Sequence, residues 1–250
     1  MEKHTVSASL TDNTKYMNRA LPVKKSFDII ERNLIIGGQN SAFYFIDGFT
    51  KDETMLKLMD SFLNISADDM PEDATSFSTS CIPYVEVDIL GDFDSIFKNL
   101  LSGVTCLFID GYEAAIAIDC RTYPSRSIEE PDKDKSLRGS RDGFVETIVF
   151  NTALMRRRIR DPHLIMEMYE AGTSTRTDVA LCYMSDRVDR ELLTTIQNKL
   201  EESKSQDLKM SQQSLAESLF QRKWYNPFPK YKFTERPDTA CACLMEGKVI

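Results

Sequence analysis

A two-stranded hairpin followed by an amphipathic helix is encoded twice in this 250-residue chain, and the two copies lie about 137 positions apart. In the first copy, the β-rich run 29–36 and the run Ala42–Ile46 flank the turn residues Gly37 and Gly38. A helix is predicted from Asp52, because apolar residues then follow at helical spacing. These residues are Met55, Leu58, Met59, Phe62 and Leu63.

The second copy repeats the same order of residue types. Val179–Tyr183 falls on Ala42–Ile46, and Asp189 falls on the helix-capping Asp52. We therefore predict an α/β (α+β) fold with two similar small subdomains of mixed sheet plus helices, related by an internal duplication. The helix positions Met55, Leu56, Met59 and Leu63 correspond to Leu192, Leu193, Ile196 and Leu200.

Four parts of the chain follow from this pattern. Residues 1–25 are polar and aperiodic, and we expect a flexible N-terminal arm or a short docking helix there. Residues 26–128 form the first subdomain and residues 141–250 the second. Residues 129–140 carry Pro131, alternating charges and Gly139, which favours a linker.

The first subdomain is predicted to contain more than its hairpin and helix. An acidic, Ser- and Thr-rich surface loop is expected over residues 65–80, followed by a strand at 82–87. A helix at 93–101 and two strands at 104–109 and 114–118 complete it.

The end of the chain matches the same subdomain. Cys243–Ile250 resembles Cys106–Gly111 plus the start of the next strand. The second subdomain is therefore expected to be cut short before a further domain of a longer protein.

Composition excludes several function classes. A net charge of −8 argues against a general nucleic-acid partner, because binding the phosphate backbone needs a basic face. The six cysteines include no CxxC pair and no zinc spacing with His4 or His163, which favours reduced thiols packed as small hydrophobic residues. No apolar stretch approaches the length of a membrane-spanning helix, so these residues are not expected to cross a bilayer.

The densest functional signal is a glycine-bearing, arginine-rich segment that leads into a helix predicted over residues 142–159. Ser140 can cap this helix, and cations in its last turn complement the helix dipole. The free N–H groups and arginines of the loop could bind a phosphate or carboxylate. Alternatively, the glycines only permit turns and the arginines pair with acids, or they face a neighbouring subunit or lipid headgroups. The candidate interface or anion-binding residues are Arg138, Gly139, Ser140, Arg141, Asp142, Gly143, Glu146, Asn151, Arg156, Arg157, Arg158 and Arg160.

No catalytic or metal-binding set accompanies this segment. The loop lacks the Lys-Ser/Thr ending of a P-loop, and His163 has no nucleophile motif nearby. The acidic run at 68–73 lacks the spacing and glycine of an EF-hand. We therefore expect no enzyme, no cofactor and no metal site. Two alternatives remain open: a metabolite sensor with a pocket between its two halves, and a phosphate-handling enzyme that uses the loop Arg138–Asp142.

Several segments resemble the GerA family of spore germination proteins. The similarity extends over roughly residues 26–250, and the block around 138–162 is its most specific part. Two segments, 117–124 and 144–154, favour a paralogue group of the family over the receptor subunits themselves. The other segments that carry the resemblance are Phe45–Phe49, Gly172–Tyr183 and Arg236-Pro237-Asp238 with Leu244–Lys248.

The resemblance implies an N-terminal soluble region of two α/β subdomains on the cytoplasmic (core) side of the spore inner membrane. A multi-helix membrane domain is expected to begin beyond Ile250. Family members are expected to assemble as oligomeric, pentameric ion channels that release cations, so the implied partners are the chain's own membrane domain, further copies and other germination membrane proteins. The family supplies no catalytic residues, and its motif is interpreted here as an intersubunit or interdomain element.

Overall fold

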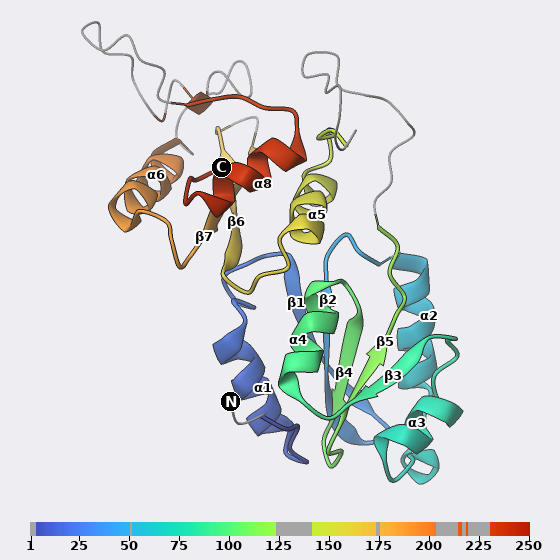
Figure 1. Ribbon diagram of the computed structural model, residues 1–250. Coiled ribbons are helices and arrows are strands. Elements are labelled where there is room, and N and C mark those ends of the chain that lie inside the picture. The colour runs from blue at the N-terminus through green and yellow to red at the C-terminus, as the bar shows by residue number, and fades with distance from the viewer. Residues whose placement is uncertain are drawn as a thin grey trace, which may run out of the picture. The chain divides into compact units, whose positions relative to one another are not determined.

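Five antiparallel strands form the sheet of the first of two units into which the computed structural model divides (Figure 1). The first unit comprises Met1–Ser125 with Ile159–Pro162, and the second comprises Arg126–Arg158 with His163–Ile250. The structure describes residues 4–50, 52–123, 142–173, 176–203, 215–216, 219 and 231–250. Within these residues, no helix combines the length and apolarity needed to span a membrane.

The sheet of the first unit has the strand order β1-β2-β4-β5-β3. Gly37 and Gly38 join its first two strands with φ angles of 54° and 78°, the left-handed values that a two-residue hairpin turn requires. The expected mixed sheet is wrong in this detail, because each described strand pairs antiparallel with its neighbours. The strands are β1 (Ile29–Ile36), β2 (Gln39–Ile46), β3 (Val87–Leu90), β4 (Thr105–Ile109) and β5 (Ala115–Ile118).

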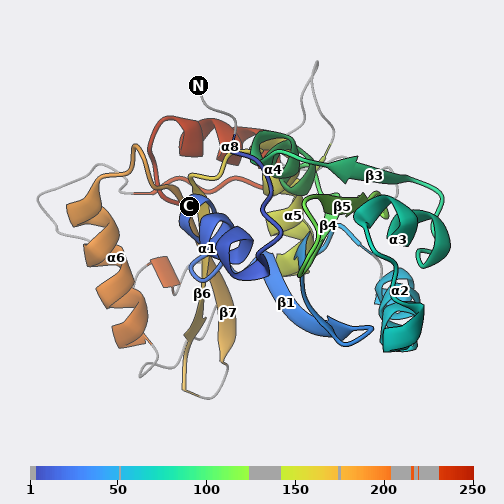
Figure 2. The ribbon, with the colours of Figure 1, turned by 90° about the horizontal axis from the view of Figure 1, so that it is seen from below.

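Helices cover both faces of this sheet. On one face, α2 (Asp52–Leu63) and α3 (Ala74–Ser80) bury Phe62 and Phe77 against strand residues such as Phe43. On the other face lie α1 (Leu10–Ala20) and α4 (Phe93–Leu101), whose aromatic side chains pack on each other and on Phe108. Figure 2 shows α2 and α3 together on the side of β1 away from α1. The α/β class predicted from the sequence is confirmed.

Of the two alternatives for residues 1–25, the structure shows the short docking helix: α1 lies there and buries Met17 completely. Two other expected segments differ from the structure. The surface loop expected at 65–80 contains the 3-10 turn Ala67–Asp69 and α3, which buries Phe77. The strand expected at 82–87 begins only at Val87, where pairing with β5 starts.

The second unit is built on the hairpin of β6 (Leu164–Ala171) and β7 (Thr177–Met184). The helix α6 (Arg190–Ser203) covers one face with Leu193, Ile196 and Leu200. Its start is capped by Asp189, as predicted, through hydrogen bonds from the backbone N–H groups of Glu191 and Leu192. Two further helices, α5 (Ile148–Arg158) and α8 (Pro237–Met245), complete the described part of the unit.

The first helices of the two units begin in the same way. In α1, the Asn13 side chain accepts the backbone N–H of Ser7 at 2.9 Å and donates to the Ser7 carbonyl at 2.6 Å. In α5, the Asn151 side chain holds Val145 through the same two bonds, at 2.7 and 2.6 Å. Both helices have eleven residues, with the asparagine at the fourth position.

The helices α4 and α8 also end in the same way. Gly103 and Gly247 follow them with φ angles of 100° and 83°. The next residue of each donates its N–H back to the helix at 3.0 Å, Val104 to Asn99 and Lys248 to Cys243.

After α8 the chain runs beside β7, and Ile250 pairs with that strand. Ile250 exchanges both backbone hydrogen bonds with Cys182, as Cys106 of β4 pairs with Tyr44 of β2. The expected match of Cys243–Ile250 to Cys106–Gly111 is therefore wrong, because Cys243 lies within a helix and Ile250 occupies the place of Cys106. The units share a structural order, while their origin by duplication stays a prediction.

Replacing Gly103 by alanine should lower the free energy of unfolding by at least about 2 kcal/mol. The positive φ strains any side chain there, and the new Cβ would collide with the buried ring of Phe49. Gly91→Ala is the matched control: a Cβ added there would meet no atom within 4 Å, so urea unfolding should change by less than about 0.5 kcal/mol. Equal unfolding curves for the two variants would contradict the prediction.

Candidate functional site

The turn in front of α5 decides where the arginine-rich helix begins. Residues 142–147 are not helical, because the Asn151 side chain occupies both backbone hydrogen-bonding groups of Val145. The helix expected at 142–159 therefore starts at Ile148 and ends at Arg158. The expected cap Ser140 and its neighbours Arg138, Gly139 and Arg141 lie outside the described residues.

The three arginines of the last turn of α5 have different environments. Arg156 is fully buried, and its Nη2 donates to the carbonyl of Leu164 at 3.0 Å, where β6 begins. Arg157 is exposed. Arg158 pairs with Asp142 at 2.7 Å, with both side chains partly exposed. Arg156 is thus excluded from any exposed assembly surface, because a buried guanidinium needs internal partners and finds one on the adjacent strand.

A second charged pair comes from a distant part of the sequence. Arg236 is 8% exposed and binds Asp238 through two hydrogen bonds, at 3.0 and 2.5 Å. The hydrogen bond from Arg236 lowers the pKa of Asp238, and the charge of Arg158 contributes to the same shift. We call Asp142, Arg158, Arg236 and Asp238 the α5–α8 charge cluster.

Backbone contacts hold this cluster together. The N–H of Phe144 donates to the carbonyl of Glu235 at 2.8 Å, just before α8. Within the helix pair, the Cys241 thiol lies 3.9 Å from the Met155 carbonyl. Burial raises the pKa of Cys241 to about 11, so its thiol stays protonated at neutral pH. The arrangement can present and fix charge, and it brings no nucleophile and base together in the described part.

The remaining candidate residues do not form one site. Gly143 is buried, while Glu146 is exposed in the turn before α5. Arg160 is exposed and belongs to the first unit. Sequence reasoning missed Arg236 and Asp238 as site residues. The available signal was the Arg-Pro-Asp segment, whose proline at the first helical position marks the start of α8.

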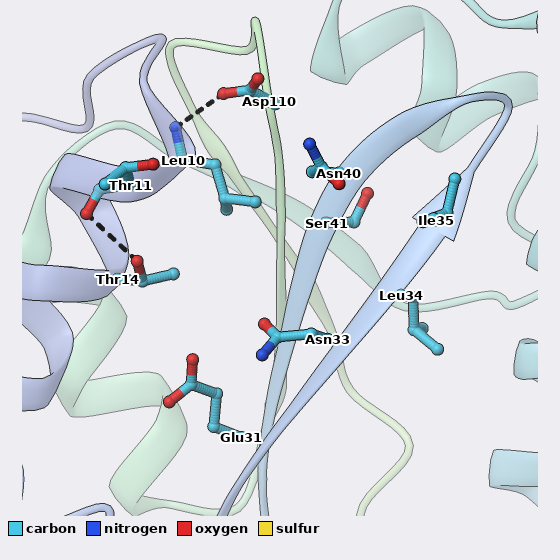
Figure 3. A pocket seen from close by; sticks show the side chains of 10 residues that line it. All are labelled: Leu10, Thr11, Thr14, Glu31, Asn33, Leu34, Ile35, Asn40, Ser41 and Asp110. Atoms are coloured by element: carbon cyan, nitrogen blue, oxygen red, sulfur yellow. Dashed lines mark hydrogen bonds between the residues drawn. The ribbon is translucent and has the colours of Figure 1, made fainter.

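A pocket of about 550 Å³ lies within the first unit, between α1 and the β1–β2 hairpin (Figure 3). Polar side chains dominate its lining. The lining residues are Leu10, Thr11, Thr14, Glu31, Asn33, Leu34, Ile35, Asn40, Ser41 and Asp110.

Comparison with known proteins places these motifs in a family context. A family model described as Bacillus/Clostridium GerA spore germination protein matches residues 15–250. Stage V sporulation protein AF of Bacillus subtilis (strain 168) is 33% identical over 250 residues, covering 100% of this chain and 50% of that protein. The uncharacterized membrane protein YfkQ of the same organism is 29% identical over 245 residues, covering 97% of this chain and 47% of that protein.

The fold also matches a solved structure. The crystal structure of the N-terminal domain of the A subunit of the Bacillus megaterium spore germinant receptor GerK3 superposes with a TM-score of 0.69. That match has 22% sequence identity and covers 100% of this chain and 92% of that one. The chain spans about half the length of the two curated relatives.

Replacing Arg156 by alanine should lower the free energy of unfolding by at least about 2 kcal/mol, because it leaves a cavity and an unpaired carbonyl at Leu164. Arg156→Met, which keeps most of the volume, separates the lost hydrogen bond from the cavity. Arg157→Ala removes the same charge from an exposed position and should stay within about 0.5 kcal/mol of the parent in urea unfolding. A larger effect at Arg157 than at Arg156 would refute this assignment.

Proposed function

This chain belongs to the GerA family of spore germination proteins, and from that premise we propose that it works as the N-terminal part of a membrane protein acting in spore germination. In this proposal the two units support assembly of an oligomeric ion channel and transmit a conformational signal to it. The matched proteins are named for germination and sporulation or as a membrane protein, and none of these names describes a reaction.

The part of the relatives that this chain does not match supports a membrane domain within the same protein. One relative is named a membrane protein, and this chain covers 47% of it. The described residues contain no membrane-length helix. We therefore place the proposed membrane domain in the part of the relatives that this chain does not cover, and the described units on the cytoplasmic side of the spore inner membrane.

The observation that carries the proposed mechanism is the way α5 is held at both ends. Asn151 and the Phe144–Glu235 bond fix its start, and the buried Arg156 ties its last turn to β6. A force applied to the exposed Arg157 would then move the strand and α8 with the helix, because packed elements shift as units. We infer that Arg157 contacts another copy of the chain, the membrane domain or another germination membrane protein.

The two other functions have less support. A metabolite sensor that holds its ligand between the two halves stays a prediction. Of the loop Arg138–Asp142, only Asp142 is described, and it pairs with Arg158. Phosphate handling therefore stays a prediction without a described site.

Arg157→Ala in the complete protein should weaken self-association roughly fivefold or more and slow germination, since an interface residue that matters contributes more than about 1 kcal/mol. Arg190→Ala, an exposed cation on α6, is the matched control. Oligomer size in detergent and the germination rate of spores are the measurements. Unchanged values for Arg157→Ala, with the fold intact, would count against the proposed contact.

A further inference from the structure

The pocket of the first unit has an acidic group at each end. Glu31 on β1 and Asp110 after β4 lie at opposite ends of the lining, with Asn33 between them (Figure 3). Asp110 accepts the backbone N–H of Leu10 at 2.9 Å, and Glu31 accepts the Asn18 amide at 3.0 Å. Neither carboxylate forms an ion pair with a cation of the described chain. Two negative charges without a cationic partner therefore face one pocket.

Two polar side chains lie against Glu31. The Asn18 amide donates to its carboxylate at 3.0 Å. Tyr44 lies directly opposite Glu31 in the β1–β2 register and is fully buried. Burial, the charge of Glu31 and a side-chain hydrogen bond to Glu31 raise the pKa of Tyr44, so the phenol stays neutral. Asn18 and Tyr44 thus fix the carboxylate of Glu31 at one end of the pocket without lining the pocket themselves.

The second unit shows that the fold does not require this polar lining. When the hairpins are aligned on Ile46 and Met184, Glu31 and Asn33 correspond to Met166 and Met168. When the helices are aligned on the clamping asparagines, Thr11 corresponds to Val149. At these three positions the second unit carries apolar side chains, while the position of Asn18 is occupied by the buried Arg156.

We propose that this pocket binds a small aliphatic dication, a diamine or polyamine, with one ammonium group at Glu31 and the other at Asp110. The carbon chain would lie against the apolar side chains of Leu10 and Ile35. A volume of about 550 Å³ is ample for such a ligand. Ligands with a carboxylate would meet like charge, and in the described residues no three His, Cys, Asp or Glu side chains converge as a metal site does. This inference goes beyond the proposed germination function and does not depend on it.

Calorimetric titration of spermidine and putrescine into the 250-residue chain tests the proposal at about 0.15 M salt, where long-range attraction is screened. We expect saturable binding to one site. Butylamine, with a single ammonium group, should bind at least about tenfold more weakly than putrescine, because it forms one charge-assisted contact instead of two.

Variants separate the pocket from the general negative charge of the chain. Glu31→Gln keeps the acceptor for Asn18 and should weaken spermidine binding about tenfold. Glu31→Met, which installs the residue type of the second unit, should abolish measurable binding while the fold persists. Glu72→Gln changes the net charge equally at an exposed position before α3, which covers the other sheet face, and should leave binding unchanged.

Three results would overturn the proposal: no spermidine binding to the parent chain, undiminished binding to Glu31→Gln, or an equal loss in Glu72→Gln. None of them bears on the germination function, which is tested at Arg157. Slow germination of the Arg157 variant together with absent spermidine binding would retain the first proposal and remove the second.

Discussion

An asparagine side chain that binds both backbone groups of the turn before its own helix is the contact on which each unit depends. Asn13 and Asn151 hold the turns that precede α1 and α5, and Ser9 caps the start of α1 by accepting the N–H of Asp12. Successive helical residues point about 100° apart, so adjacent side chains of α5 face different environments. In α5 this geometry turns Arg156 inward and leaves Arg157 exposed.

The same turn joins the first helix of each unit to a later one. The N–H of Val6 donates to the Gly91 carbonyl before α4, and that of Phe144 donates to the Glu235 carbonyl before α8. These bonds connect residues far apart in sequence, so local patterns could not predict them. The sequence accordingly left a flexible arm and a docking helix open for residues 1–25, and it predicted a helix from 142 where the structure has a turn. The sequence did contain one signal that α1 and α5 are alike. An Asn-Thr pair followed by Met three residues later occurs at 13–17 and again at 151–155.

Elements with a strong local signal were predicted well. The helix at 93–101 agrees with α4 because Asp92 caps it, its apolar spacing is regular and Gly103 ends it. The hairpins were equally readable from their turns and alternating strands. For the site, the sequence predicted only which segment carries the charged residues. The burial of Arg156 and the ion pair of Asp142 with Arg158 depend on packing and could not be predicted. The contribution of Arg236 required the fold, because α8 lies far along the chain.

The two units use one framework in different ways, and the difference has an energetic basis. In the first unit the carboxylate of Glu31 lies against the buried Tyr44 and raises the pKa of its phenol. The second unit has the buried Met166 at the position of Glu31, with no charge to accommodate there. Natural sequences depart from the local rules of stable packing mainly where function requires it. Since the second unit has methionine at the positions of Glu31 and Asn33, these two polar residues of the first unit are better explained by what the pocket binds than by what the fold needs.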